Sequence, residues 1–282
     1  MIKTGLESAA YFGLYDYEQG LKRLKKDGYD CIDYSELCNK NSDLYKMSDN
    51  EYRDFLNKVG AAAKETGVEI VQLHALWPME DRSEEGRKAT IAYFIKEIEG
   101  AHCLGCKHVV IHPFMPYGWG AEVDREEIWN MNVSLFQTLL PYAEKYDVIL
   151  CVENLPFTAL TISTVAEVKR LVRTLDSPYV KVCLDTGHAN VFHDDLAADV
   201  RLLGDDLATL HVHDNKGNWD QHLTPYQGNI DWEAFLLALK EIGFKGCFSL
   251  ETYPSLKTPQ PILDEMRVSL SRLAKMMADK LE

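Results

Sequence analysis

The sequence has 282 residues, of which 46% are hydrophobic and 26% charged, and its formal net charge is −14 at pH 7. This composition is typical of a globular protein, and the length suits one large domain. Its acidity argues against general attraction to nucleic acid or to an anionic membrane. No apolar run approaches the roughly 18 residues that a membrane-spanning helix needs, so no membrane segment is expected.

The first residues, MIKTGLESAAYFG, lack the basic start and apolar segment of a secretion signal. The chain has seven cysteines, and four of them lie in apolar, strand-like runs: Cys31, Cys151, Cys183 and Cys247. A buried thiol packs there like a small apolar side chain, so we expect no disulfide framework. These features predict a cytoplasmic protein in a reducing compartment.

Short runs with strand character alternate along the chain with longer segments of helical period. Eight runs are predicted as strands: 3–6, 31–35, 69–74, 108–112, 148–153, 180–185, 207–213 and 247–251. Amphipathic segments between them, such as 17–28, 50–67 and 230–243, end on a glycine, as helices commonly do. The alternation predicts an α/β protein with one (β/α)8 TIM barrel over residues 1–282. An open doubly wound sheet fits less well, because no linker divides the chain.

Residues of metal-binding type stand at the carboxyl ends of six predicted strands. They are His74, His112, Glu153, Asp185, His211 and Glu251. In a barrel these strand ends surround one mouth, where the active sites of this fold lie. One such residue is commonly a structural group or a helix cap. Coincidence does not account for six, so we predict a metal centre.

Further candidate residues lie close in sequence to these six. His188 follows in LDTGHAN, and Asp220 and His222 lie in the loop after the seventh strand. Alternation along LHVHD points His213 the same way as His211, so His213 is predicted to line the pocket or to support a ligand. Two glutamates, an aspartate and an imidazole suit Mn²⁺, Mg²⁺, Co²⁺ or Zn²⁺, and more histidines favour zinc.

Five segments, VENLP, LDTGHAN, LHVHDN, DQHLTPYQGNIDW and FSLE, resemble the xylose-isomerase-like barrel superfamily. The resemblance covers essentially the whole chain. Members include sugar phosphate isomerases and epimerases, ketose 3-epimerases, inosose dehydratases and family-2 apurinic/apyrimidinic endonucleases. The resemblance implies a TIM barrel enzyme that depends on a divalent metal.

In the ketose 3-epimerase branch one metal is held by residues that match Glu153, Asp185, His211 and Glu251. The resemblance implies that Glu153 and Glu251 are the acid/base pair beside a substrate carbonyl, and that His188 hydrogen-bonds a substrate oxygen. The implied activity is isomerisation or epimerisation of a sugar, a sugar phosphate or a related hydroxyketone. An inosose-type dehydratase is the alternative that shares the first step.

Loops around the predicted mouth offer substrate contacts. Trp77 and Trp119 suit the apolar face of a small, sugar-like substrate. Lys216 stands where the epimerases carry a substrate-gripping arginine, although a solvated loop lysine is the simpler interpretation. A homo-oligomer is compatible with the sequence.

The endonuclease branch is the competing interpretation, since it binds three zinc ions through nine ligands. The matching residues are His74, His112, Glu153, Asp185, His188, His211, Asp220, His222 and Glu251. The segments LWPMEDRSEEGR and PFMPYGWGAEVDREE, which follow the third and fourth strands, are acidic and aromatic instead of basic. We therefore place isomerase or epimerase chemistry ahead of a zinc phosphodiesterase.

Overall fold

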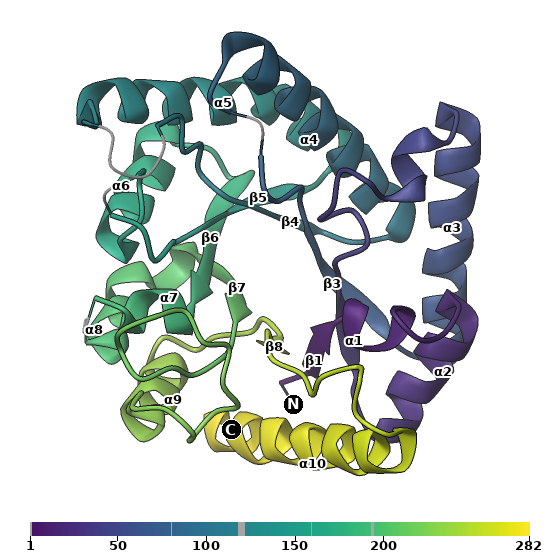
Figure 1. The fold of residues 1–282 in the computed structure, drawn as a ribbon. Coiled ribbons are helices and arrows are strands. Elements are labelled where there is room, and N and C mark those ends of the chain that lie inside the picture. Colours follow the sequence, from purple (N-terminus) through teal and green to yellow (C-terminus); the bar gives the residue numbers. More distant parts are fainter. Residues whose placement is uncertain (1, 80, 118–121, 159, 193–194) are drawn as a thin grey trace.

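Eight parallel strands form a closed barrel in the computed structural model, which describes residues 2–79, 81–117, 122–158, 160–192 and 195–282 (Figure 1). The strands are β1 Thr4–Glu7, β2 Cys31–Tyr34, β3 Glu69–His74, β4 His108–Ile111, β5 Ile149–Glu153, β6 Val180–Asp185, β7 Leu207–His211 and β8 Phe248–Leu250. Their order is β7-β6-β5-β4-β3-β2-β1-β8. A parallel bridge between Val212 and Leu250 joins the two edges. The predicted (β/α)8 TIM barrel is confirmed.

Helices form the outer layer of the barrel (Figure 1). They are α1 Ala9–Phe12, α2 Tyr17–Asp27, α3 Asp49–Thr66, α4 Glu84–Leu104, α5 Arg125–Tyr146, α6 Val165–Leu175, α7 Thr186–Asn190, α8 Leu196–Leu203, α9 Trp232–Glu241 and α10 Gln260–Ala278, with 3-10 turns η1 Asp43–Lys46, η2 Gly204–Asp206 and η3 Asp279–Leu281. Ser48 begins α3 with a capping box. Gly67 ends this helix with a φ of 73°, as the sequence predicts. Within the described ranges, no helix is long and apolar enough to cross a membrane.

Side chains alternate between the two faces of each strand, and this alternation positions the site. Val182 and Leu184 of β6 pack in the large core between sheet and helices. Cys183 points the other way and packs inside the barrel with Val110 and Cys151. The next residue of that inward row on β6 is Asp185, so the barrel core ends in a polar layer at the carboxyl end.

One pair of cysteines lies close together. Cys31 at the start of β2 and Cys247 just before β8 face each other across β1, but their Cα atoms are 7.5 Å apart, farther than an ordinary disulfide spans. Gly5 of β1 lies between these strands, and a Cβ on it would come within 2.7 Å of the Cys31 sulfur. The missing side chain leaves room for the sulfurs to meet across β1. The other described cysteines are free.

Candidate metal centre and active site

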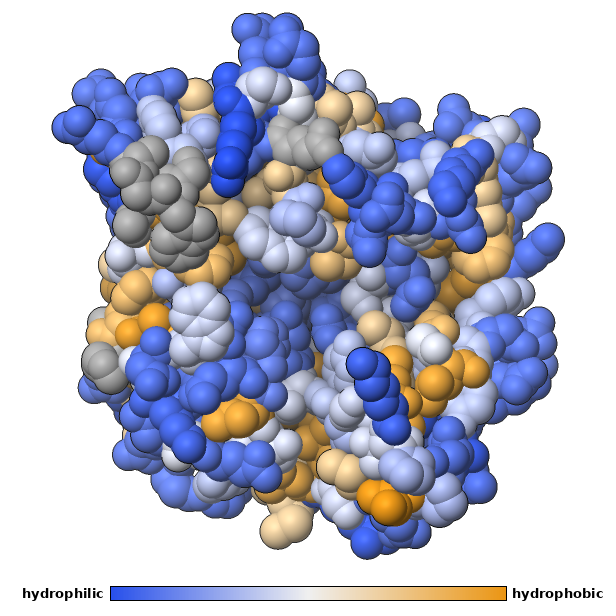
Figure 2. Space-filling model, in the orientation of Figure 1, coloured by the Kyte–Doolittle hydropathy of each residue, from blue (hydrophilic) through white to orange (hydrophobic). Residues whose placement is uncertain are grey.

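The six predicted strand-end residues all lie at one mouth of the barrel. Four are the last residues of their strands, and two follow the strand directly: His74, Glu153, Asp185 and His211, then His112 and Glu251. The space-filling view onto this end shows a hollow with hydrophilic side chains at its centre (Figure 2). Barrel closure brings these residues together, since each comes from a different strand.

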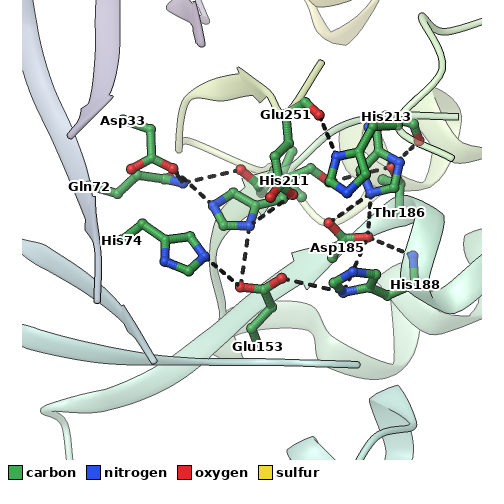
Figure 3. A network of polar contacts seen from close by, with 12 residues as sticks. Asp33, Gln72, His74, Glu153, Asp185, Thr186, His188, His211, His213 and Glu251 are labelled. Atoms are coloured by element: carbon green, nitrogen blue, oxygen red, sulfur yellow. Dashed lines mark hydrogen bonds and ion pairs between the residues drawn. The ribbon is translucent and has the colours of Figure 1, made fainter. Parts of the chain in front are cut away.

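Four donors converge in the middle of the mouth and are called the carboxylate-rich group: Glu153, Asp185, His211 and Glu251 (Figure 3). One ligand atom from each lies within 4.8 Å of the others. Glu153 Oε1, His211 Nδ1 and Glu251 Oε2 are buried without a hydrogen-bond partner. Clustered, buried carboxylates are costly unless positive charge compensates them. The donor set therefore fits a divalent metal ion.

Two imidazoles flank Glu153 on one side of the mouth. His112 Nε2 lies 3.0 Å from Glu153 Oε2, and His74 Nε2 lies 3.8 Å from the same oxygen. The His74 ring stacks on His211 with centroids 5.4 Å apart, and the Trp77 ring contacts His112 at 4.6 Å. His74 and His112 thus hold Glu153 in place, and Trp77 forms a wall beside them.

A second cluster, the histidine-rich group, surrounds the carboxylate of Asp220 in the loop between β7 and α9. Its members are His188, His213, Asp220 and His222. The Nε2 atoms of His188 and His222 lie 3.3 Å and 3.2 Å from Asp220 Oδ2, and that of His213 lies 3.6 Å from Oδ1. His213 Nε2 is also 3.1 Å from both oxygens of Asp185. His213 therefore links the two groups.

The segment LDTGHAN shapes this link. Asp185 caps α7 by accepting a 2.6 Å hydrogen bond from the His188 backbone N–H. The Asn154 carbonyl accepts a 2.9 Å bond from His188 Nδ1, which leaves Nε2 facing Asp220. The Gly187 backbone packs directly against the His213 ring, because a Cβ on Gly187 would be only 1.9 Å from His213 Cε1. These local contacts thus fix the positions of the His188 and His213 rings.

The two glutamates have opposite pKa shifts. Burial opposes ionisation of Glu153, but His112 and His211 lower its pKa well below the ordinary value. Burial raises the pKa of Glu251 well above the ordinary value; His211 opposes this shift, and the negative charge of Asp185 adds to it. The site therefore contains two carboxyl groups of very different proton affinity.

Charge also holds the histidine-rich group together. Burial opposes ionisation of Asp220, but hydrogen bonds from His188 and His222 lower its pKa below the ordinary range. Burial disfavours the charged form of His222, yet its hydrogen bond to Asp220 raises the pKa of His222 to about 10. These bonds are charge-assisted and stronger than neutral ones.

Three buried polar residues beside the site are absent from the sequence prediction. Asp33 of β2 contacts His211, and Gln72 of β3 donates a hydrogen bond to Asp33. Asn154 donates to the Asp185 carbonyl at 2.9 Å and accepts from its N–H at 2.8 Å. Their sequence signal is a polar side chain inside or beside an apolar strand, on the same alternation as the strand-end ligands.

The three residues predicted to contact a substrate, Trp77, Lys216 and Trp119, differ in where they lie. Trp77 lies at the mouth, beside a cavity of about 250 Å³ that Met115, Tyr117 and Phe157 also line. Lys216 is exposed in the β7–α9 loop, and its backbone N–H donates to Gln221. No described contact joins its ammonium group to the donors. Trp119 lies outside the described residues.

Known proteins with similar sequences include sugar-converting enzymes. An uncharacterized protein of Methanocaldococcus jannaschii is 34% identical over 193 residues, covering 65% of this chain and 64%, slightly less than two thirds, of that protein. An inosose isomerase of Bacillus subtilis is 27% identical over 192 residues, covering 66% of this chain and 68% of the relative. The D-psicose 3-epimerase of Agrobacterium fabrum is 25% identical over 271 residues, covering 93% of this chain and 86% of the relative.

Structural comparison gives the same fold. A crystal structure of the IOLI protein with a bound zinc atom has a TM-score of 0.78 at 23% identity, over 99% of this chain and 98% of that chain. The sequence profile described as Xylose isomerase-like TIM barrel matches residues 21–273. This match spans most of the barrel and includes every donor described above. The chain therefore belongs to the xylose isomerase-like TIM barrel family.

Proposed function

We propose that the protein is a divalent-metal-dependent isomerase or epimerase of a sugar, a sugar phosphate or a related hydroxyketone. The observation that carries the proposal is the carboxylate-rich group, in which four strands deliver Glu153, Asp185, His211 and Glu251 to within 4.8 Å of one another. The inosose isomerase and D-psicose 3-epimerase among the relatives support this class of substrate.

The same four residues would hold the cation. Two glutamates, an aspartate and an imidazole suit Mn²⁺, Mg²⁺, Co²⁺ or Zn²⁺. When bound, such an ion polarises a substrate carbonyl and makes the adjacent C–H more acidic. The buried, unpartnered atoms Glu153 Oε1, His211 Nδ1 and Glu251 Oε2 support this assignment.

Glu153 and Glu251 are proposed to move the proton. They come from opposite sides of the mouth, and each has an oxygen 3.3 Å from His211 Nδ1. One carboxylate removes the proton beside the carbonyl, and the other returns a proton to the neighbouring atom or to the opposite face. His188 lies 3.3 Å from Glu153 Oε1 and is proposed to hydrogen-bond a substrate oxygen. Trp77 packs on an apolar face of the substrate.

Isotope exchange tests the proposal. Ketoses, their phosphates and inososes are incubated in D₂O with the protein loaded with each metal in turn, and deuterium in substrate and product is measured by mass spectrometry and NMR. We expect metal-dependent incorporation at the carbon next to the carbonyl. A metal-free sample is the control. Absence of exchange in all substrates at full metal occupancy would overturn the proposal.

A dehydratase of an inosose-like ring ketone would share the proton abstraction. It would then lose hydroxide instead of regaining a proton, so its product would be lighter than the substrate by one water molecule. The inosose isomerase relative keeps a ring ketone among the candidate substrates. The product masses from the same D₂O experiment separate isomerase from dehydratase.

The histidine-rich group favours a second class, a zinc phosphodiesterase. Together with His74 and His112, the two groups gather all nine residues that match the endonuclease ligands at one mouth. The net charge of −14 and the acidic loops count against DNA binding. Incubation with a duplex that contains an abasic site, in the presence of Zn²⁺, tests this class. Efficient incision would reverse our order of preference.

A further inference from the structure

A buried carboxylate lies behind His211, on the side away from the other donors (Figure 3). Asp33 Oδ2 is 2.9 Å from His211 Nε2, and the same oxygen accepts a 2.9 Å hydrogen bond from Gln72 Nε2. Asp33 and Gln72 are fully buried. Asp33 comes from β2 and His211 from β7, so the contact crosses the interior of the barrel.

This contact decides which nitrogen of His211 faces the proposed metal site. An ionised carboxylate only accepts hydrogen bonds, so Nε2 of His211 must carry a proton. In the neutral ring the lone pair is then on Nδ1. That atom lies 3.3 Å from Glu153 Oε2 and 3.3 Å from Glu251 Oε2. The lone pair thus points at the carboxylates with which it would share a cation.

Packing alone does not explain Asp33. Asp33 Oδ1 and Gln72 Oε1 are buried without a hydrogen-bond partner. A buried, unpaired polar atom costs stability, so apolar residues at both positions would suit a purely structural barrel interior better. Gln72 also donates a 3.4 Å bond to the carbonyl of Leu210, the residue before His211. Asp33 therefore contacts the His211 ring, and Gln72 contacts the residue before it in β7.

We propose that Asp33 is a positioning residue that holds His211 in the Nε2–H tautomer with Nδ1 directed at the cation, and that Gln72 orients Asp33. The inference rests on the proposed function only in taking His211 as a metal ligand. Carboxylate partners of metal-bound histidines orient the ring and make it a stronger donor, and their loss typically weakens metal binding about 10–100-fold.

The test compares metal affinity and the tautomer of His211. The ring nitrogens are observed by NMR in metal-free protein labelled with ¹⁵N-histidine. Affinity is measured on a separate sample by calorimetric titration with Mn²⁺, which favours the oxygen-rich donors. Asp33→Ala should weaken Mn²⁺ binding by about 10–100-fold and remove the protected Nε2–H signal. Asp33→Asn and Gln72→Leu should weaken binding less, because an acceptor for Nε2–H remains in both. These two variants also report on the proposal if Asp33→Ala fails to fold.

Asp27→Asn is the matched control. Asp27 is also a buried carboxylate, but it accepts its bond from Tyr11 and lies in α2. The Asp27→Asn substitution should leave the Mn²⁺ affinity and the His211 Nε2–H signal unchanged. Wild-type Mn²⁺ affinity and an intact Nε2–H signal in both Asp33 variants would overturn the inference. His211→Ala identifies the other failure: if it binds Mn²⁺ like the wild type, His211 is no ligand and the proposed metal site is itself wrong.

Discussion

Replacing Gly187 with alanine tests how the two donor groups are joined. A Cβ at Gly187 would lie 1.9 Å from His213 Cε1, whereas ordinary contact begins at 3.4 Å, so the ring must retreat by the difference, about 1.5 Å. This movement breaks the contacts of Nε2 with the Asp185 oxygens, which are now 3.1 Å long. Overpacking costs about 1–3 kcal/mol and a hydrogen bond to a charged group contributes about 1.5–3 kcal/mol. We expect Gly187→Ala to lower the free energy of unfolding by the sum of these two terms, roughly 2.5–6 kcal/mol.

Urea unfolding of the metal-free protein, followed by circular dichroism, measures this loss. The control adds Gly187→Ala to His213→Ala. Without the ring the three atoms nearest to the added Cβ are gone. Alanine is favoured over glycine inside a helix by roughly 0.5–1 kcal/mol, so the same substitution should cost much less than in the wild type. Equal costs in both backgrounds, or an unchanged urea midpoint in the single variant, would refute the inferred packing of His213 on Gly187.

Three further predictions concern the carboxyl groups and the metal. Glu251→Gln keeps size and one oxygen donor but removes the carboxylate that moves the proton, so kcat should fall by about 10²–10⁴-fold with KM little changed. If kcat and D₂O exchange survive at full metal occupancy, the two-glutamate mechanism is excluded. Asp185→Asn and His211→Ala should each lower metal content, measured by elemental analysis, together with activity, because each removes a ligand. Burial raises the pKa of Glu97 from 4.5 to about 8, so the folded state keeps a proton that the unfolded state releases. The resulting stability is complete below pH 4.5 and is lost as the pH rises through about 8. Glu97→Gln should therefore flatten the fall in urea midpoint between these pH values, and an equally steep fall in the variant would contradict the shift.

The barrel was predictable because its strands are buried on both faces and therefore form apolar runs. The strands predicted at 69–74 and 180–185 match β3 and β6 residue for residue. The prediction of 207–213 runs past the end of β7 at His211. Val212 pairs with β8 there, and Asp214 turns away to pair antiparallel with Leu223. Sequence alternation continues through this change of direction, so it cannot mark the end of the strand.

The division of the donors into two groups was harder to predict from the sequence than the barrel. Asp220 and His222 depend on the path of the β7–α9 loop, in which His222 has a φ of 46°, a left-handed conformation that periodicity does not predict. The role of Asp33 depends on a contact between β2 and β7, which are far apart in the sequence. Strand-end position identifies candidate ligands, but only tertiary structure shows which of them share an ion.

The proton on His213 limits what the histidine-rich group can bind. His213 Nδ1 is buried without a partner, whereas Nε2 faces the carboxylates of Asp185 at 3.1 Å and Asp220 at 3.6 Å. A neutral ring therefore carries its proton on Nε2, where the bond to Asp185 uses it, and that nitrogen has no lone pair for a metal. His213 therefore supports Asp185 as a hydrogen-bond donor and links it to Asp220, and its Nε2 is not available to a metal ion.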